Sequence, residues 1–245
     1  MVAGIILAGG KGTRIKSESV NKVTLPFSGK PMIQYGIEVL HPFVSQLIVV
    51  VGAYADSVKS TLTSFDVEYA LQEEQLGTGH AVKIALPYLR ADTDHIIVGY
   101  GDHMMFYQHK TVERMIKRHI DEEAAVTCIT TSLEDPAAYG RILRDEDGYM
   151  YGIVEKKDAT PEQLKIKEIN AGFYIFNAFF LQNSIPLIKP SPVSKEYYLT
   201  DLVDIAVKSH QTVIGMEVPY QEVGIGINTH DELTESLQLY KTRAK

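Results

Sequence analysis

The sequence has a single cysteine and no tryptophan among its 245 residues. Cys128 cannot form a disulfide within the chain, and its place in the apolar run 124–129 predicts a buried structural thiol rather than a nucleophile. Long apolar runs are also missing. Runs such as 2–7 are far shorter than the ~20 residues needed to cross a bilayer, so we expect no membrane-spanning segment. The sequence shows no basic leader with a cleavage site, and we expect a cytoplasmic protein.

The chain has fewer basic than acidic residues. Lys and Arg number 24 against 31 Asp and Glu, which gives a formal net charge of -7. This balance argues against nucleic acid or an anionic membrane as a partner, because both require a basic surface. A phosphate-binding site would therefore need local cations and backbone N–H groups. Hydrophobic residues make up 45% of the chain, which is enough for a core in one large domain or two small ones.

Apolar, β-branched runs alternate with helical patterns through the first half of the chain. The runs 2–7, 46–51, 67–70, 95–100 and 124–131 predict strands, and the stretches 32–41, 54–62, 79–89 and 110–123 predict helices. This alternation favours an α/β fold, with a mostly parallel sheet covered by helices on both faces. Ligands of such sheets bind at the carboxyl ends of the strands.

The second half of the chain has a different pattern. The runs 141–143 and 149–154 flank a turn-forming segment, 145–148, and predict a hairpin, so we expect a small antiparallel subdomain. Runs 171–176 and 212–218 predict further strands. A last helix should begin at Thr229, whose hydroxyl forms a capping box with Glu232. Leu233, Leu237 and Tyr240 then give this helix one apolar face.

A glycine-rich loop, residues 7–14, follows the first expected strand. Its three glycines allow backbone N–H groups to surround an anion, and Arg14 adds a fixed charge. The loop is neither a P-loop nor a dinucleotide fingerprint, because Ile5 and Ile15 stand where those motifs need glycine. A tight connector is the alternative that the pattern leaves open. Lys22 is another candidate phosphate contact, although a lone lysine in a loop is usually only solvated.

Asp102 follows the expected strand 95–100 and should lie at the ligand edge of the sheet. A carboxylate there suits Mg²⁺, which takes few protein ligands and keeps several waters, while a turn or capping role is the open alternative. Two Asp-x-Asp pairs, 92/94 and 145/147, resemble a metal motif of glycosyltransferases. The first precedes its strand and the second lies in the hairpin turn, so we expect solvated or capping carboxylates at both.

Several motifs occur in an order that resembles a known family. They are 7–14, Lys22, 25–26, 29–32, Gln72, 75–81, 100–102, 139–142, 152–155, 157–160, 168–170, 196–201 and 226–228. Together they resemble sugar-phosphate nucleotidyltransferases, and most closely the uridyltransferase domain of bifunctional N-acetylglucosamine-1-phosphate uridyltransferase. The resemblance covers nearly the whole chain. It implies a Rossmann-like fold of the nucleotide-diphospho-sugar transferase type, in which we expect a catalytic domain over residues 1–228 with a helix over 229–245 packed on it and an antiparallel sugar-side subdomain.

The resemblance also implies an activity and its residues. The enzyme would join a nucleoside triphosphate, with UTP the first to test, to a sugar-1-phosphate, with N-acetylglucosamine-1-phosphate the first to test, and release pyrophosphate. Asp102 and Asn228 would hold Mg²⁺, Arg14 would bind the leaving pyrophosphate, and Lys22 would bind the α-phosphate. The nucleotide would contact Ala8, Gly10, Gln72, Gly77 and Thr78. The sugar would contact Gly140, Glu155, Asn170, Tyr198 and Thr200.

Two departures from the family pattern bear on these expectations. His103, Met104 and Met105 follow Asp102 where the family usually has a proline, so the local shape or the sugar preference can differ. The sequence has no hexapeptide-repeat region, so it does not predict the acetyl-transfer activity of the bifunctional relatives. A non-catalytic nucleotide-sugar sensor and a glycosyltransferase of related architecture are the alternatives. The sequence leaves the base, the sugar and the oligomeric state open.

Overall fold

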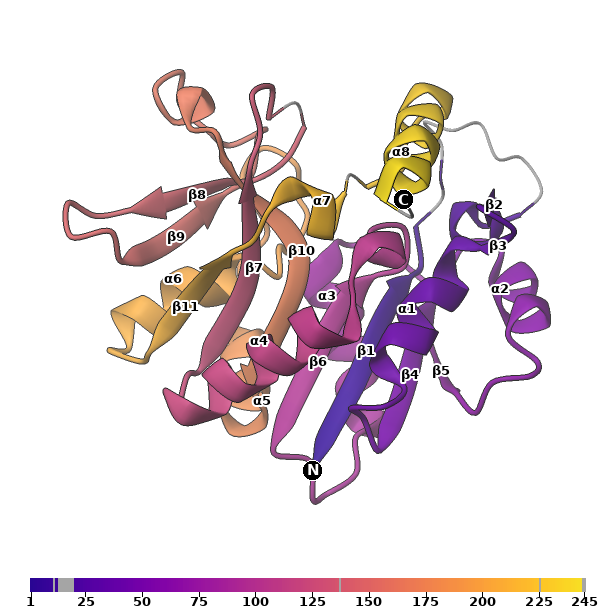
Figure 1. The fold of residues 1–245 in the computed structure, drawn as a ribbon. Helices are drawn as coiled ribbons and strands as arrows, with labels where there is room; N and C mark the ends of the chain where they lie inside the picture. The colour runs from indigo at the N-terminus through magenta and orange to yellow at the C-terminus, as the bar shows by residue number, and fades with distance from the viewer. Residues whose placement is uncertain (11, 13–19, 137, 225, 244–245) are drawn as a thin grey trace.

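A central twisted sheet organises the computed structural model, which describes residues 1–10, 12, 20–136, 138–224 and 226–243 (Figure 1). Its main path runs β11-β7-β10-β6-β1-β4-β5, and β8 and β9 join it beside β10. The strands are β1 (Val2–Ala8), β4 (Gln46–Val51), β5 (Glu68–Leu71), β6 (His95–Tyr100), β7 (Val126–Ser132), β8 (Arg141–Arg144), β9 (Met150–Val154), β10 (Glu168–Asn177) and β11 (Val213–Glu217). A separate pair, β2 (Pro26–Phe27) and β3 (Lys30–Pro31), is antiparallel.

The direction of the strands decides which residues reach the ligand edge. β6, β1, β4 and β5 are mutually parallel, and β11 is parallel to β7. β10 is antiparallel to both β6 and β7. The carboxyl ends of β1 and β6 therefore share one edge with the amino end of β10, and the expected mostly parallel sheet is confirmed.

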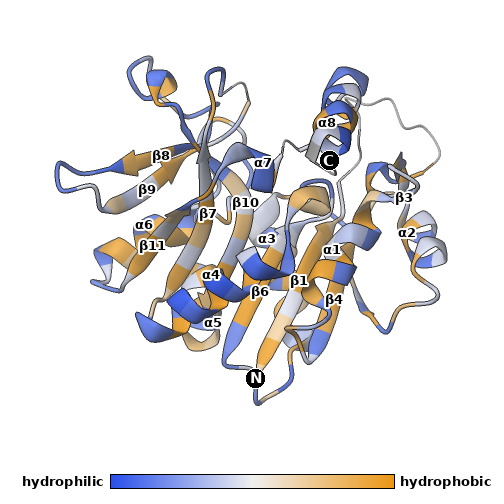
Figure 2. Cartoon of the chain, viewed as in Figure 1, coloured by the Kyte–Doolittle hydropathy of each residue, from blue (hydrophilic) through white to orange (hydrophobic). Residues whose placement is uncertain are grey.

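Helices cover both faces of the sheet because successive strand residues point to opposite sides. Ile6 and Val49 join one hydrophobic cluster with residues of α1 (Met32–Leu40), α2 (Ala55–Thr61) and α4 (His109–Asp121). Ile5 and Ile48 join the other with α3 (Thr78–Ala85), α5 (Ala178–Ser184) and α6 (Asp201–Lys208). Figure 2 shows hydrophobic strands β1 and β4 and a hydrophilic outer face on α4.

The expected hairpin and the expected capping box are both present. β8 and β9 pair antiparallel, and the Asp145 carboxylate accepts hydrogen bonds from the backbone N–H groups of Asp147 (3.1 Å) and Tyr149 (2.8 Å) in the turn. At the start of α8 (His230–Arg243), Thr229 N–H donates to Glu232 Oε2 (2.8 Å) and Glu232 N–H donates to Thr229 Oγ1 (3.1 Å).

The apolar face of α8 packs on an aromatic cluster near the ligand edge. Tyr240 makes edge contacts with Phe27, Tyr35 and Phe106, with ring centroids 5.2, 5.8 and 5.6 Å apart. Leu233 and Leu237 pack against the same cluster. Burial of aromatic surface in this arrangement anchors α8 beside α1 and the short 3₁₀ turn η4 (Met104–Phe106).

Some boundaries differ from the sequence prediction for identifiable reasons. The helix expected over 79–89 ends at Ala85 and continues as a 3₁₀ turn, η3 (Leu86–Tyr88), because Pro87 lacks an N–H and clashes with a helical carbonyl. Short apolar helices α5 and α6 and the four-residue α7 (Tyr220–Val223) were not predicted. The remaining 3₁₀ turns are η2 (Lys22–Thr24), η5 (Gln163–Lys165) and η6 (Ile185–Leu187). Among the described residues, every helix is too short or too polar to cross a membrane.

Candidate active site

A cavity of about 460 Å³ opens at the ligand edge of the sheet. Most of the site residues expected from the sequence line it: Ala8, Gly10, Lys22, Gln72, Gly77, Thr78, Asp102, Gly140, Glu155, Asn170, Tyr198 and Asn228. Thr200 is buried behind the wall, where its hydroxyl donates to Glu155 Oε1 at 3.1 Å. Arg14 lies outside the described residues. Residues distant in the sequence thus converge on one cavity.

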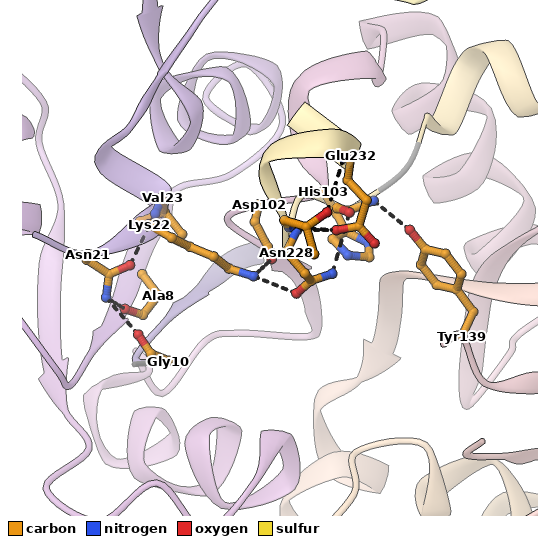
Figure 3. Close-up of polar contacts among 12 residues, drawn as sticks. Ala8, Gly10, Asn21, Lys22, Val23, Asp102, His103, Tyr139, Asn228 and Glu232 are labelled. Carbon is orange, nitrogen blue, oxygen red and sulfur yellow. Dashed lines mark hydrogen bonds and ion pairs between the residues drawn. The ribbon is translucent and has the colours of Figure 1, made fainter. Parts of the chain in front are cut away.

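Asn21 fastens the chain where it leaves β1. Its side-chain amide donates to the carbonyl oxygens of Ala8 (2.8 Å), Gly10 (3.2 Å) and Ala53 (2.9 Å), and its Oδ1 accepts from Val23 N–H (3.2 Å). The residue is only 1% exposed. Asn21 therefore sets the backbone of the glycine-rich loop at Ala8 and Gly10 and the start of the turn that carries Lys22 (Figure 3).

Lys22, Asp102 and Asn228 all line the cavity and contact one another there (Figure 3). The Lys22 ammonium forms an ion pair with Asp102 Oδ2 and donates to Asn228 Oδ1 at 2.8 Å. The Lys22 and Asp102 side chains are 15% and 12% exposed, so water screens this pair weakly. A carboxylate oxygen and an amide oxygen from distant segments thus face the same cation.

The charge state of Asp102 follows from this contact. Burial raises the pKa of the carboxyl, but the Lys22 ammonium, His103 and the hydrogen bonds outweigh that effect and hold the pKa below its ordinary value. Asp102 is therefore a carboxylate at neutral pH. A buried carboxylate that stays ionised can bind a cation.

Gln72 and the turn at Gly77 follow the carboxyl end of β5 and form one wall of the cavity. Gln72 is buried, and its amide donates to Gly77 O at 3.2 Å and lies 3.1 Å from His80 Nδ1. Gly77 has φ +109°, and a Cβ there would lie 2.6 Å from Tyr197 O. Thr78 Oγ1 accepts from Leu199 N–H at 3.0 Å. These contacts tie the first half of the chain to the segment that carries Tyr198.

The opposite wall is built from β10 and the hairpin. Asn170 is buried near the start of β10, where its Nδ2 donates to Tyr174 OH (2.5 Å) and its Oδ1 accepts from Gly172 N–H (3.0 Å). The register of β10 against β7 shifts between Asn170 and Tyr174, which marks a bulge. Gly172 has φ +69° in this bulge, a conformation that favours glycine.

Glu155 follows β9 and faces Gly140 across this wall. A Cβ at Gly140 would lie 3.3 Å from Glu155 Oε2, so the glycine leaves room for the carboxyl group. Burial raises the pKa of Glu155, and the hydrogen bond from Thr200 opposes the shift without cancelling it. The group is therefore easier to protonate than a surface glutamate.

Met104, two residues after Asp102, packs against Gly36 and Gly99. Met104 is buried, and a Cβ at Gly36 or Gly99 would lie 2.8 or 2.5 Å from its sulfur. The thioether therefore packs between α1 and β6, which makes Met104 part of the core. His103 lines the cavity, and its Nδ1 lies 3.4 Å from Ala171 O.

Neither Asp-x-Asp pair lies in the cavity. Asp94 precedes β6 and pairs with the amino group of Met1 at the opposite edge of the sheet, and Asp145 caps the hairpin turn. Both positions agree with the capping or solvated carboxylates expected from the sequence. No group of three or more His, Cys, Asp or Glu residues able to hold a metal occurs within the described ranges.

Sequence reasoning did not place three of the residues that line the cavity in the site. Asn21, Tyr139 and Glu232 line the cavity. The capping pattern predicted Glu232 as a helix cap, but its position in the cavity depends on where α8 packs. Asn21 and Tyr139 act through hydrogen bonds to backbone atoms far away in sequence, and residue patterns carry no signal for such bonds.

Comparisons with known proteins identify the class of enzyme. The family model for nucleotidyl transferase matches residues 3–221. The chain therefore belongs to the nucleotidyl transferase family. A crystal structure of a Bacillus anthracis protein, described provisionally as a glucose-1-phosphate thymidylyltransferase in complex with a sucrose, has the same fold. It aligns with TM-score 0.78 and 22% identity over 98% of this chain and 95% of that one.

The chain is also similar to curated proteins named "Bifunctional protein GlmU". It is 41% identical to the one from Exiguobacterium sibiricum, over 95% of this chain and 51% of that protein. It is 38% identical to the one from Pelobacter propionicus, over 99% of this chain and 53% of that protein. The chain thus spans about half the length of these relatives. A Desulfotalea psychrophila relative is 38% identical over 99% of this chain and 72% of its own length.

Proposed function

We propose that the chain condenses UTP with N-acetylglucosamine-1-phosphate and releases pyrophosphate. In this reaction a phosphate oxygen of the sugar phosphate attacks the α-phosphorus of the triphosphate. The new P–O bond replaces the bond to the β-phosphate, and the electron pair leaves with pyrophosphate. The observation that carries the proposal is the convergence of Lys22, Asp102 and Asn228 beside the glycine-rich loop, in a chain of the nucleotidyl transferase family.

A divalent ion fits the oxygen atoms at this point. Asp102 Oδ2 and Asn228 Oδ1 already face one cation, the Lys22 ammonium, and hard oxygen ligands suit Mg²⁺. We therefore assign Asp102 and Asn228 as the protein ligands of Mg²⁺. When bound, the ion would neutralise charge on the phosphate oxygens.

One half of the cavity would bind the nucleoside triphosphate. Lys22 would bind the α-phosphate, and Arg14 the leaving pyrophosphate, so that fixed positive charge meets the charge that moves in the transition state. Backbone groups of Ala8 and Gly10, fixed by Asn21, would contact the nucleotide. Gln72, Gly77 and Thr78 would contact the base through neutral hydrogen-bonding groups, which suit a neutral uracil ring.

The opposite half of the cavity would bind the sugar. Glu155 and Asn170 can hydrogen-bond hydroxyl or N-acetyl groups, and Gly140 permits close approach. Tyr198 lines the cavity, and Thr200 orients Glu155. Because the half-buried Glu155 has a raised pKa, its protonated form is more accessible than that of a surface glutamate, and this form can also donate a hydrogen bond.

The organisation of the protein belongs to the same proposal. Residues 1–228 would form the catalytic domain, with α8 packed on it through Tyr240 and its neighbours. We further propose a cytoplasmic enzyme whose substrates are the triphosphate and the sugar phosphate, with neither nucleic acid nor a membrane as a partner. The excess of acidic residues supports this, because nucleic acid and anionic membranes bind basic protein surfaces.

A matrix assay tests the proposal. Several nucleoside triphosphates are each combined with several sugar-1-phosphates and Mg²⁺, and released pyrophosphate is measured. We expect the highest rate with UTP and N-acetylglucosamine-1-phosphate and no release when either substrate is omitted. Tight product binding without turnover across the matrix would favour a sensor, and sugar transfer from a nucleotide sugar to an acceptor would favour a glycosyltransferase.

A matched pair of variants tests the metal assignment. Asp102→Asn removes the negative charge that faces Lys22 in the cavity, and we expect kcat to fall by about 10²-fold or more, as when an electrostatic group of an active site is removed. Asp147→Asn removes an exposed carboxylate of the hairpin turn and should leave kcat unchanged. Normal turnover in Asp102→Asn would contradict the assignment.

A further inference from the structure

Asn228 lies in the segment 226–229. Each backbone N–H group of this segment donates a hydrogen bond to a residue outside it. Gly226 N–H donates to Tyr139 OH (2.7 Å), and Ile227 N–H donates to the carbonyl oxygen of Asp102 (3.2 Å). The N–H groups of Asn228 (2.6 Å) and Thr229 (2.8 Å) both donate to Glu232 Oε2. We call this segment the Asn228 strap. Figure 3 shows Asn228 of this segment between Asp102 and Tyr139.

The strap is also fixed by packing. Ile227 is fully buried in the aromatic cluster that anchors α8. At Gly226 a Cβ would lie 1.5 Å from His103 Nε2, so the backbone presses directly on the imidazole ring. These contacts bring the strap against the residues that follow Asp102. The two proposed metal ligands are therefore held together by backbone contacts as well as by their shared cation.

Glu232 does more in this arrangement than cap a helix. A capping box needs the carboxylate to accept from the N-cap residue, which here is Thr229. The same oxygen accepts a second and shorter hydrogen bond from Asn228 N–H, the amide of the proposed metal ligand itself. Charged acceptors form stronger hydrogen bonds than neutral ones. Removing the Glu232 side chain would release two adjacent amides of the strap at once.

We propose that Glu232 is a positioning residue that fixes Asn228 opposite Asp102 and thereby sets the affinity of the cavity for its divalent ion. The inference rests on the proposed function, because it takes Asn228 as a metal ligand. Glu232 acts through the strap backbone and is not itself a ligand. Partners that orient metal ligands typically change metal affinity by 10–100-fold when they are removed.

Direct metal binding tests the inference without turnover. Free Mn²⁺ is measured by electron paramagnetic resonance during titration of the protein without substrates. We expect Glu232→Ala to weaken Mn²⁺ binding by about tenfold, and Glu232→Gln, whose amide oxygen can still accept both N–H groups, to weaken it by roughly threefold. Glu235→Ala removes an exposed carboxylate on the same helix and should leave binding unchanged.

A second variant separates positioning from helix stability. Thr229→Ala removes the hydroxyl that accepts from Glu232 N–H but leaves the Glu232 carboxylate and both of its strap bonds. We expect Thr229→Ala to lower the Tm in common with Glu232→Ala while keeping Mn²⁺ affinity within twofold of the parent. An equal loss of Mn²⁺ affinity in both variants, or no loss in Glu232→Ala, would overturn the inference.

The same titration keeps this inference separate from the proposed function. Asp102→Asn should abolish measurable Mn²⁺ binding at concentrations that saturate the parent protein. If Asp102→Asn binds Mn²⁺ normally, the assignment of the metal ligands is wrong, and the positioning role of Glu232 is refuted as well. If Asp102→Asn loses binding but Glu232→Ala retains it, the metal site stands and the positioning role is refuted.

Discussion

Replacing Lys22 should strengthen metal binding while it weakens catalysis. The Lys22 ammonium occupies the same oxygens, Asp102 Oδ2 and Asn228 Oδ1, that we assign to the divalent ion. Both cations cannot hold these oxygens together, so an incoming ion must displace Lys22. The variant Lys22→Met keeps the apolar stem and removes the competing charge. The same change removes the group proposed to bind the α-phosphate.

The size of each effect follows from the contacts. A hydrogen bond that involves a charged group contributes about 1.5–3 kcal/mol, and each 1.4 kcal/mol is a tenfold change in affinity. We expect Mn²⁺ to bind Lys22→Met about tenfold more tightly, at the low end of this range, because the displaced ammonium of the parent regains water or phosphate contacts. Loss of a fixed charge at the reacting phosphate should lower kcat by about 10²-fold or more.

The assay is a Mn²⁺ titration at pH 8, because the protonation state of Asp102 also depends on Lys22. Without the ammonium, burial raises the pKa of Asp102, so Mn²⁺ binding to the variant should fail at a higher pH than binding to the parent. Lys30→Met, which removes a lysine paired with Glu38, is the matched control and should bind Mn²⁺ as the parent does. Equal or weaker Mn²⁺ binding by Lys22→Met at pH 8 would refute the competition.

Further predictions concern the scaffold around the cavity. Asn21→Ala removes the hydrogen-bond donor of the Ala8 and Gly10 carbonyl groups. It should lower the Tm and reduce kcat/KM for the triphosphate at least about tenfold, and unchanged kinetics would contradict this. Gly77→Ala should destabilise the fold by about 1–3 kcal/mol in urea denaturation, since φ is +109° and the new Cβ meets Tyr197 O. Buried His119 has its pKa lowered from 6.5 to about 4 by burial and by His95. The unfolded chain therefore takes up the proton first, and the free energy of unfolding should fall by about 3 kcal/mol as the pH drops from 6.5 to 4. His119→Gln should flatten this slope in denaturation at pH 7 and pH 4.5, and an unchanged slope would exclude His119 as its cause.

Local patterns predicted much of the fold because the sheet is built from strong signals. The boundaries expected for β4 and β6 agree with the structure, since both strands are continuous apolar runs buried on both faces. The helix over 79–89 was predicted too long because its apolar period continues past Pro87. α5 and α6 were missed because each is too short to give a clear helical pattern, and packing against the sheet stabilises helices of this length.

The candidate site was predictable to the extent that its residues sit in recognisable motifs. Asp102 follows a strand and Gly77 lies in a glycine-rich turn, so each carries a local signal. The ion pair of Lys22, the bulge that turns Asn170 and the contact of Glu232 with Asn228 do not. The ion pair joins segments far apart in the chain, the bulge depends on how β10 pairs with β7, and the Glu232 contact depends on where α8 packs. A single sequence does not encode these arrangements as a pattern.

The reversed direction of β10 decides which of its two connections lies at the ligand edge of the sheet. Because β10 enters the sheet at the ligand edge, the connection before Glu168 arrives at the edge where Asn170 lines the cavity, in the half proposed to bind the sugar. The connection after Asn177 leaves at the opposite edge, beside Asp94. Insertions or deletions ahead of Glu168 would therefore change the wall proposed to bind the sugar and leave the carboxyl ends of β1 and β6, beside the proposed phosphate contacts, in place.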